Sequence, residues 1–135
     1  MENIDKYIGI PYKFNGRTRE SGCDCLGLCY LFYKEHGWIT LDDGKPITKD
    51  WREKDPHRLA RWFGKHFKVT RDPEQLEFGD ILLFDVFGDT HLAIYLEYGR
   101  VLALQLPTRD WSKSTIYHKD SWLHGFKAGF KRCPN

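Results

Sequence analysis

The chain has 135 residues, a formal net charge of +2, and 41% hydrophobic and 16% aromatic residues. A chain of this length typically forms one domain with one core, so we expect residues 1–135 to be a single domain. The apolar content excludes general disorder, and the small net charge excludes a polycation for nucleic acid. No apolar run approaches the length of a membrane span. The segment Met1–Lys6 lacks the features of a secretory signal, so we expect synthesis in the cytoplasm.

The first half of the chain predicts helices after an opening loop. The segment 8–16 is rich in turn-forming residues and predicts ordered loop. Asp24 is a favourable N-cap and Gly37 a favourable C-terminal stop, so a helix is expected between them. Its apolar residues recur at the spacing of one helix face, at Cys25, Leu28, Cys29 and Phe32. A second helix is predicted to start at Asp55-Pro56, with a buried stripe of Leu59, Trp62, Phe63 and Phe67.

The second half changes to the alternation of strands. Strands are predicted at 81–84, 92–96 and 101–104, with shorter ones at 115–117 and 126–128. We expect Glu97-Tyr98-Gly99 to form a three-residue hairpin loop. Helices followed by an antiparallel sheet indicate the α+β fold class.

Cys25 is the first candidate for chemistry, because it lies in the first turn of the predicted helix. Backbone N–H groups and the positive end of the helix dipole favour a thiolate there, the form that attacks a carbonyl. The same N–H groups can stabilise the resulting oxyanion. The alternative is that Cys25 is a small core residue.

His91 and Gln105 are the candidate partners of Cys25. His91 begins a predicted strand, which holds a side chain rigidly where a general base is needed. If Leu96 pairs with Arg100, then Gln105 lies opposite His91, with their Cβ atoms about 5 Å apart. Its amide oxygen then accepts a hydrogen bond from the imidazole. His118 is the competing third member.

Four motifs in order resemble the NlpC-type cell-wall cysteine peptidases. They are Pro11-Tyr12, Gly22-Cys23-Asp24-Cys25-Leu26-Gly27-Leu28, Gly79-Asp80-Ile81 and His91-Leu92-Ala93-Ile94-Tyr95-Leu96. The resemblance spans Ile8 to Leu106 and implies a papain-like core, with N-terminal helices packed on a C-terminal antiparallel sheet. It also implies hydrolysis of peptidoglycan stem peptides, typically between D-γ-glutamate and a diamino acid.

Carried over by position, the resemblance makes Cys25 the nucleophile and His91 the base, with no metal or cofactor. Asp24 would meet the free amine of the substrate, and Tyr12 would line the substrate cleft. Two residues depart from the family pattern. Leu26 stands where the family has Ser, and Ala103 stands where it usually has the third catalytic His, so Gln105 must substitute.

The ending Gly125–Phe130 resembles the last strand of phage-encoded members. Without a signal peptide, a phage tail component that opens the wall locally is the expected setting, with tail-tip proteins as partners. A lysin or an injected toxin also fits. The alternative functions are an inactive papain-like module in a tail tip and a papain-like deamidase or acyltransferase.

The remaining cysteines and charges favour structural interpretations. Zinc binding by Cys23, Cys25 and Cys29 is not favoured, because the first spacing is too short and no second pair exists. A Cys23–Cys133 disulfide stays open, and Cys29 is expected in the core. The basic stretch 51–71 predicts a solvated helix face, with anionic wall polymer or an acidic neighbour as alternatives, and no nucleic-acid motif accompanies it.

Overall fold

The structure is a computed structural model that describes residues 4–14, 16–38, 61, 63, 65–86, 89–104 and 113–132. Its elements in chain order are the 3₁₀ helix η1 (Asp5–Tyr7), β1 (Arg17–Thr18), β2 (Gly22–Cys23), α1 (Cys25–Glu35), β3 (Lys68–Thr70), η2 (Pro73–Gln75), β4 (Ile81–Val86), β5 (Asp89–Glu97), β6 (Arg100–Ala103), β7 (Thr115–Tyr117), α4 (Lys119–Trp122), η3 (Leu123–Gly125) and β8 (Phe126–Lys131).

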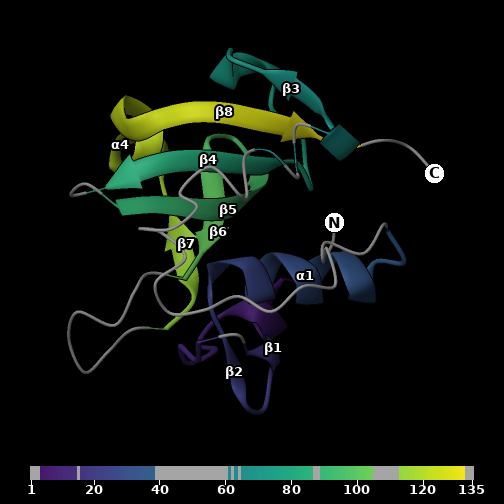
Figure 1. Cartoon of the computed structure of the whole chain (residues 1–135). Helices are drawn as coiled ribbons and strands as arrows, with labels where there is room; N and C mark the ends of the chain where they lie inside the picture. The colour runs from purple at the N-terminus through teal and green to yellow at the C-terminus, as the bar shows by residue number, and fades with distance from the viewer. Residues whose placement is uncertain are drawn as a thin grey trace.

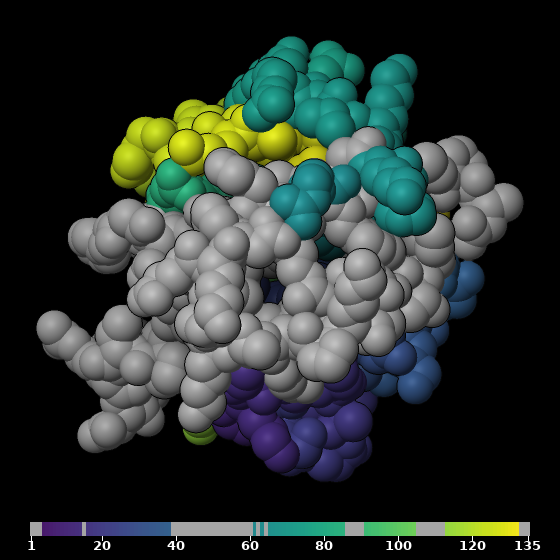
Figure 2. Space-filling model, viewed as in Figure 1, coloured from purple at the N-terminus to yellow at the C-terminus, as the bar shows by residue number. Residues whose placement is uncertain are grey.

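The elements form a helix layer on a sheet layer. Six strands pair in the order β3-β8-β4-β5-β6-β7, every pair antiparallel, and α1 lies against this sheet (Figure 1). In the space-filling view the N-terminal residues and α1 form one side of the molecule and the β3 and β8 segments the other (Figure 2). The predicted α+β arrangement is therefore confirmed.

The two faces of the sheet carry separate apolar clusters. Alternate residues of a strand point to opposite faces. The face that packs against α1 includes Leu83, Leu92, Ile94 and Leu102. The other face includes Leu82, Phe84, Ala93 and Ala103, and Trp122 packs against it.

The direction of α1 follows from contacts at its C-terminal end. Tyr33 donates a hydrogen bond to the carbonyl oxygen of Gly79, and the Phe32 ring lies 5.9 Å from that of Phe78. Both partners directly precede β4, whose first residue Ile81 pairs with Ile94 of β5. The start of α1 is therefore directed to the opposite end of the sheet, where β4 ends and β5 begins.

Most of the predicted elements are present. The helix after Asp24 and the five predicted strands are confirmed, and three of the strands are two to four residues longer than expected. Phe63 and Phe67 are buried, as the second predicted stripe requires. The predicted start of this second helix at Asp55-Pro56 lies outside the described residues, as do the stripe residues Leu59 and Trp62. None of the described helices combines the length and apolar character that crossing a bilayer demands.

The hairpin between β5 and β6 differs from the expected three-residue loop. Glu97 pairs with Arg100, so the loop is Tyr98-Gly99 alone, and the register shifts between Tyr95 and Glu97. Both loop residues have positive φ, 56° and 78°, as a type I′ turn requires. On the far side of this shift, the pairs from Tyr95–Val101 to Ala93–Ala103 keep the register that pairing Leu96 with Arg100 predicts.

The start of α1 is fixed by a cap and by close backbone packing. The Asp24 carboxylate accepts hydrogen bonds from the Gly27 N–H at 2.7 Å and from Arg17 at 3.3 Å. A Cβ atom added at Gly27 would lie 1.8 Å from the carbonyl oxygen of Gly16. The absence of a side chain at this position therefore lets the preceding segment lie against the helix.

We predict that Gly27→Ala destabilises the fold by about 2 kcal/mol or more, because the added methyl meets backbone that cannot rotate away. Urea unfolding followed by circular dichroism measures the change. Lys34→Ala, at an exposed position of the same helix, is the control and should stay within about 0.5 kcal/mol of wild type. Equal stability of the two variants would contradict the close contact.

Candidate active site

Cys25 is the first residue of α1, directly after the Asp24 cap. Its side chain is partly exposed and packs at the edge of the core cluster under α1. The thiol therefore lies where the positive end of the helix dipole acts on it and where a substrate has access. The alternative of a sealed core residue does not fit this exposure.

The two neighbouring cysteines, Cys23 and Cys29, differ from Cys25 because their side chains are buried. Cys23 is fully buried, its thiol donates a hydrogen bond to the Thr18 carbonyl, and burial raises its pKa to about 11. Cys29 is also buried in the core, as predicted, and burial raises the pKa of its thiol well above the ordinary value. Within the described part of the chain, Cys23, Cys25 and Cys29 are not joined in disulfides. Cys133, the partner in the disulfide left open above, lies outside the described residues.

His91 lies on β5 with its side chain 7% exposed. It alternates with Leu92 and so shares a sheet face with Ala93, away from α1. Its ring centroid lies 5.8 Å from that of Phe84, its partner on β4. A cavity of about 500 Å³ opens beside it, lined by Phe84, Asp85, His91, Ala103, Leu104, Tyr117, Ser121, Trp122, His124 and Gly125.

Cys25 and His91 lie at the same end of the layered pair formed by α1 and β5, because α1 begins where β5 begins. They approach that end from different sides of the sheet. A reaction between them requires the sulfur to meet the imidazole around the end of the strand, not through the sheet. The sequence-predicted pairing of Cys25 with His91 stays a prediction.

The structure bears on the predicted third catalytic residue, Gln105, only through the register of β5 and β6. Ala93 pairs with Ala103, so continuing the ladder by two residues would place position 105 opposite His91. Gln105 itself lies outside the described residues. His118, the competitor, is exposed and occupies the N-cap position of α4 without a capping hydrogen bond from its side chain.

The two predicted substrate contacts, Asp24 and Tyr12, flank the helix start. Tyr12 is half-buried, forms an isolated bridge with Cys23 and packs against the core cluster under α1. Asp24 is 9% exposed, and the cap and the Arg17 ion pair already use its carboxylate. Their contact with substrate stays a prediction, and for Asp24 it must compete with these internal bonds.

The cavity beside His91 includes residues that the sequence did not single out. Tyr117 and Trp122 close it from β7 and α4, and burial raises the pKa of the Tyr117 hydroxyl. The four-residue helix α4 carries too short a pattern for detection by periodicity. Within the described ranges, no three His, Cys, Asp or Glu side chains converge as metal ligands would.

Comparisons with known proteins identify the family to which the fold belongs. Residues 9–125 match the NlpC/P60 family. The chain is 25% identical over 138 aligned residues to the gamma-DL-glutamyl hydrolase of Bacillus subtilis (strain 168), which covers 100% of this chain and 29% of that protein.

Solved structures support the same fold. The NlpC/p60 domain of the peptidoglycan hydrolase SagA matches with a TM-score of 0.57 and 22% identity, covering 93% of this chain and 90% of that one. An NlpC/P60 family protein from Bacillus cereus matches with a TM-score of 0.64 and 23% identity, covering 95% of this chain and 37% of that one. The papain-like α+β fold is thereby established.

We predict that iodoacetamide at pH 8 modifies Cys25 before Cys23 or Cys29. A thiol with a pKa near 11 is ionised in only about one molecule in a thousand at this pH, and both neighbours are buried. Peptide mass spectrometry of a Cys133→Ser variant measures the order of labelling. Denaturation in urea should abolish the selectivity, and earlier labelling of Cys23 would contradict the assignment.

Proposed function

The chain belongs to the NlpC/P60 family, and we propose that it is a cysteine peptidase that hydrolyses an amide bond in peptidoglycan stem peptides. The observation that carries this proposal is a partly exposed thiol at the capped start of α1, beside two buried thiols whose pKa burial raises. The relatives support the substrate class, since one is named a peptidoglycan hydrolase and another a gamma-DL-glutamyl hydrolase.

The proposed bond is the one between D-γ-glutamate and a diamino acid. This is the bond that the sequence resemblance implies, and the printed name of the Bacillus subtilis relative refers to glutamyl bonds of the γ type. The chain spans only 29% of that relative's length, so it corresponds to one part of the relative and not to the whole protein. The family-typical Ser is here Leu26, which is 8% exposed and offers no hydrogen bond to a substrate.

The proposed reaction proceeds through a thioester. His91 accepts the proton of the Cys25 thiol, and the thiolate attacks the carbonyl carbon of the amide. The Cys25 backbone N–H stabilises the oxyanion. Collapse breaks the C–N bond while the imidazolium protonates the leaving amine. A water that gives its proton to His91 then hydrolyses the thioester, which releases a carboxylic acid and restores the thiol.

The delivery route is part of the proposal. A phage tail tip remains our proposed setting, and it rests on the sequence resemblance of the segment 125–130 alone, which is now seen as the end of η3 and most of β8. The relatives described above are not named as tail proteins. Purification of virions followed by mass spectrometry would detect the chain as a tail component.

A second candidate is an inactive module with the same fold. It is favoured by Ala103, which is 2% exposed and carries only a methyl group where the family pattern has a histidine. The first experiment below separates the two candidates, because an inactive module releases no product.

We predict that the wild-type protein releases new free amines from purified peptidoglycan and that Cys25→Ala releases none. His91→Gln should lower the rate by about 10²-fold or more, since the general base is lost. His66→Gln, at an exposed histidine elsewhere, is the control and should keep the wild-type rate. Mass analysis of the soluble product identifies the bond, and product release by Cys25→Ala would refute the mechanism.

Replacing Gln105, the proposed third catalytic residue, should lower the rate less than replacing His91. We predict that Gln105→Ala lowers kcat by about tenfold with little change in KM, because an orienting group acts on the base and not on substrate binding. His118→Ala should leave both constants near wild type. The opposite result, with kcat reduced in His118→Ala alone, would make His118 the orienting residue.

A further inference from the structure

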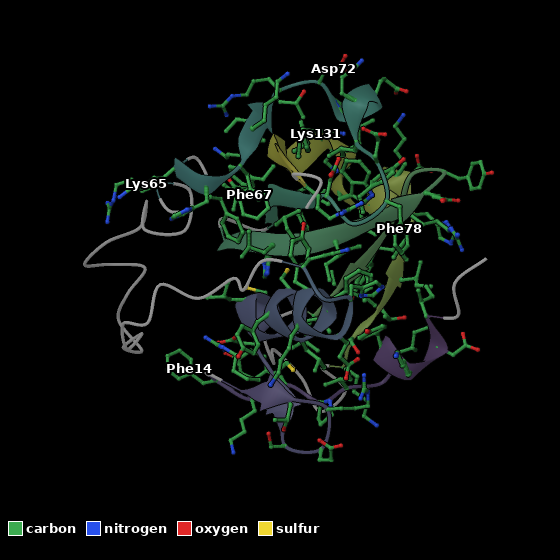
Figure 3. The ribbon with its side chains drawn as sticks, turned by 90° about the vertical axis from the view of Figure 1, so that its right-hand side faces the viewer. Phe14, Lys65, Phe67, Asp72, Phe78 and Lys131 are labelled. Atoms are coloured by element: carbon green, nitrogen blue, oxygen red, sulfur yellow. The ribbon has the colours of Figure 1, made fainter. Side chains whose placement is uncertain are left out.

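The cavity beside His91 lies on the face of the sheet that is turned away from α1. Its lining includes Ala103 and Trp122, which belong to the apolar cluster on that face. Phe67 and Phe78, labelled in Figure 3, pack instead with the cluster between the sheet and α1. The cavity and the start of α1 therefore lie on different sides of the sheet.

The place of His91 assigns the cavity to one half of the substrate. In the proposed reaction the carbonyl carbon meets the Cys25 sulfur, and the imidazole protonates the leaving nitrogen. The acyl half of the substrate then stays at the start of α1, where Tyr12 and Asp24 are its expected contacts. The chain beyond the nitrogen continues past His91, beside which the cavity opens. The cavity is therefore placed for the amine half, the part that leaves first.

The walls of this cavity are apolar and held in place. Four of its lining residues are almost fully buried: Phe84, Ala103, Leu104 and Trp122. The Trp122 indole N–H donates a hydrogen bond to the Gly99 carbonyl oxygen at 3.0 Å, so Trp122 presents its ring to the cavity and not its donor. Such walls favour an apolar occupant, since a polar group would lose its water without gaining a partner.

The charged and hydroxyl groups of the lining do not change this character. Apart from the imidazole and one tyrosine hydroxyl, they come from Ser121 and His124, which are exposed, and from Asp85, which forms an ion pair with Lys127 at 3.1 Å. The described lining contains neither lysine nor arginine. A charged end of the occupant would therefore stay at the rim in contact with water, while its methylene groups lie inside.

Ala103 sets the depth of the cavity. It pairs with Ala93 of β5 and Thr115 of β7, so its position in the sheet is fixed from both sides. Because its methyl group lines the cavity, any larger side chain here would occupy part of the space of about 500 Å³. That volume is within the range of about 300–1,000 Å³ typical of ligand pockets. The departure from the family histidine at this position thus opens room beside the general base.

From these features we infer that the cavity between Ala103 and Trp122 holds the aliphatic side chain of the residue on the amine side of the scissile bond. This identification rests on the proposed function, under which that residue is the diamino acid of the stem peptide. Its unbranched methylene chain lies against the Trp122 ring, and its terminal polar group stays at the rim beside Ser121 and His124. Ala103 and Trp122 then determine specificity, because they select the amine half by the length of its side chain.

The first test compares three synthetic amides that share a γ-D-glutamyl group and carry L-lysine amide, L-norleucine amide or glycine amide on the amine side. Norleucine keeps an unbranched aliphatic chain and lacks the ammonium. We expect wild type to cleave the first two with kcat/KM within about threefold of each other and the glycine substrate about tenfold less efficiently, as for an unfilled apolar pocket. Equal efficiency with norleucine and glycine would overturn the inference. A preference for lysine over norleucine beyond about tenfold would also overturn it, by placing the ammonium inside.

Variants identify the residue that sets the depth. Ala103→Val adds two methyl groups toward the cavity and should lower the norleucine-to-glycine ratio of kcat/KM by about tenfold. Ala103→His fills the same space and should lower this ratio as well. Thr115→Val, at the exposed residue that pairs with Ala103 outside the lining, is the matched control and should leave the ratio unchanged. Thermal unfolding checks that each variant is folded, and an unchanged ratio in both folded Ala103 variants would overturn the inference.

A binding measurement separates this inference from the proposed function. The ¹⁵N-labelled Cys25→Ala protein is titrated with L-norleucine amide and, in parallel, with glycine amide. We expect norleucine amide alone to shift the indole N–H resonance of Trp122, and the same titration of the Cys25→Ala, Ala103→Val double variant to give about tenfold weaker binding.

The two proposals fail in different ways. A shift at Trp122 that Ala103→Val weakens, with no cleavage of peptidoglycan or of the amides by wild type, would leave the cavity standing and remove the hydrolase. Cleavage by wild type with equal efficiency for norleucine and glycine, and no shift at Trp122, would keep the hydrolase and overturn the inference.

Discussion

The capped start of α1 is the constraint on which the candidate site depends. Asp24 holds the Gly27 N–H and the Arg17 guanidinium, and the missing side chain at Gly27 lets Gly16 approach the helix. A cap of this kind contributes about 0.5–2 kcal/mol, and it also fixes which residue comes first in the helix. Because that residue is Cys25, the same bonds that stabilise the fold orient the thiol.

The helix and the adjoining strand also explain why three nearby cysteines differ. Cys29 follows Cys25 by one helical turn and lies deeper on the same face, inside the core. Cys23 belongs to β2, whose pairing with β1 keeps its thiol against the Thr18 carbonyl. Burial raises the pKa of both thiols. Of these three cysteines, Cys25 at the helix start is therefore the one whose side chain is partly exposed.

Sequence reasoning succeeded where local chemistry decides the structure. Asp24 and Gly37 bound α1 correctly, and the alternation in β5 predicted a strand with His91 near its start. It failed at Tyr98-Gly99, since Tyr is not a typical residue of a type I′ turn and the register shift has no local signal. The sides from which Cys25 and His91 approach, and the cavity closed by Trp122, depend on tertiary packing that no spacing encodes.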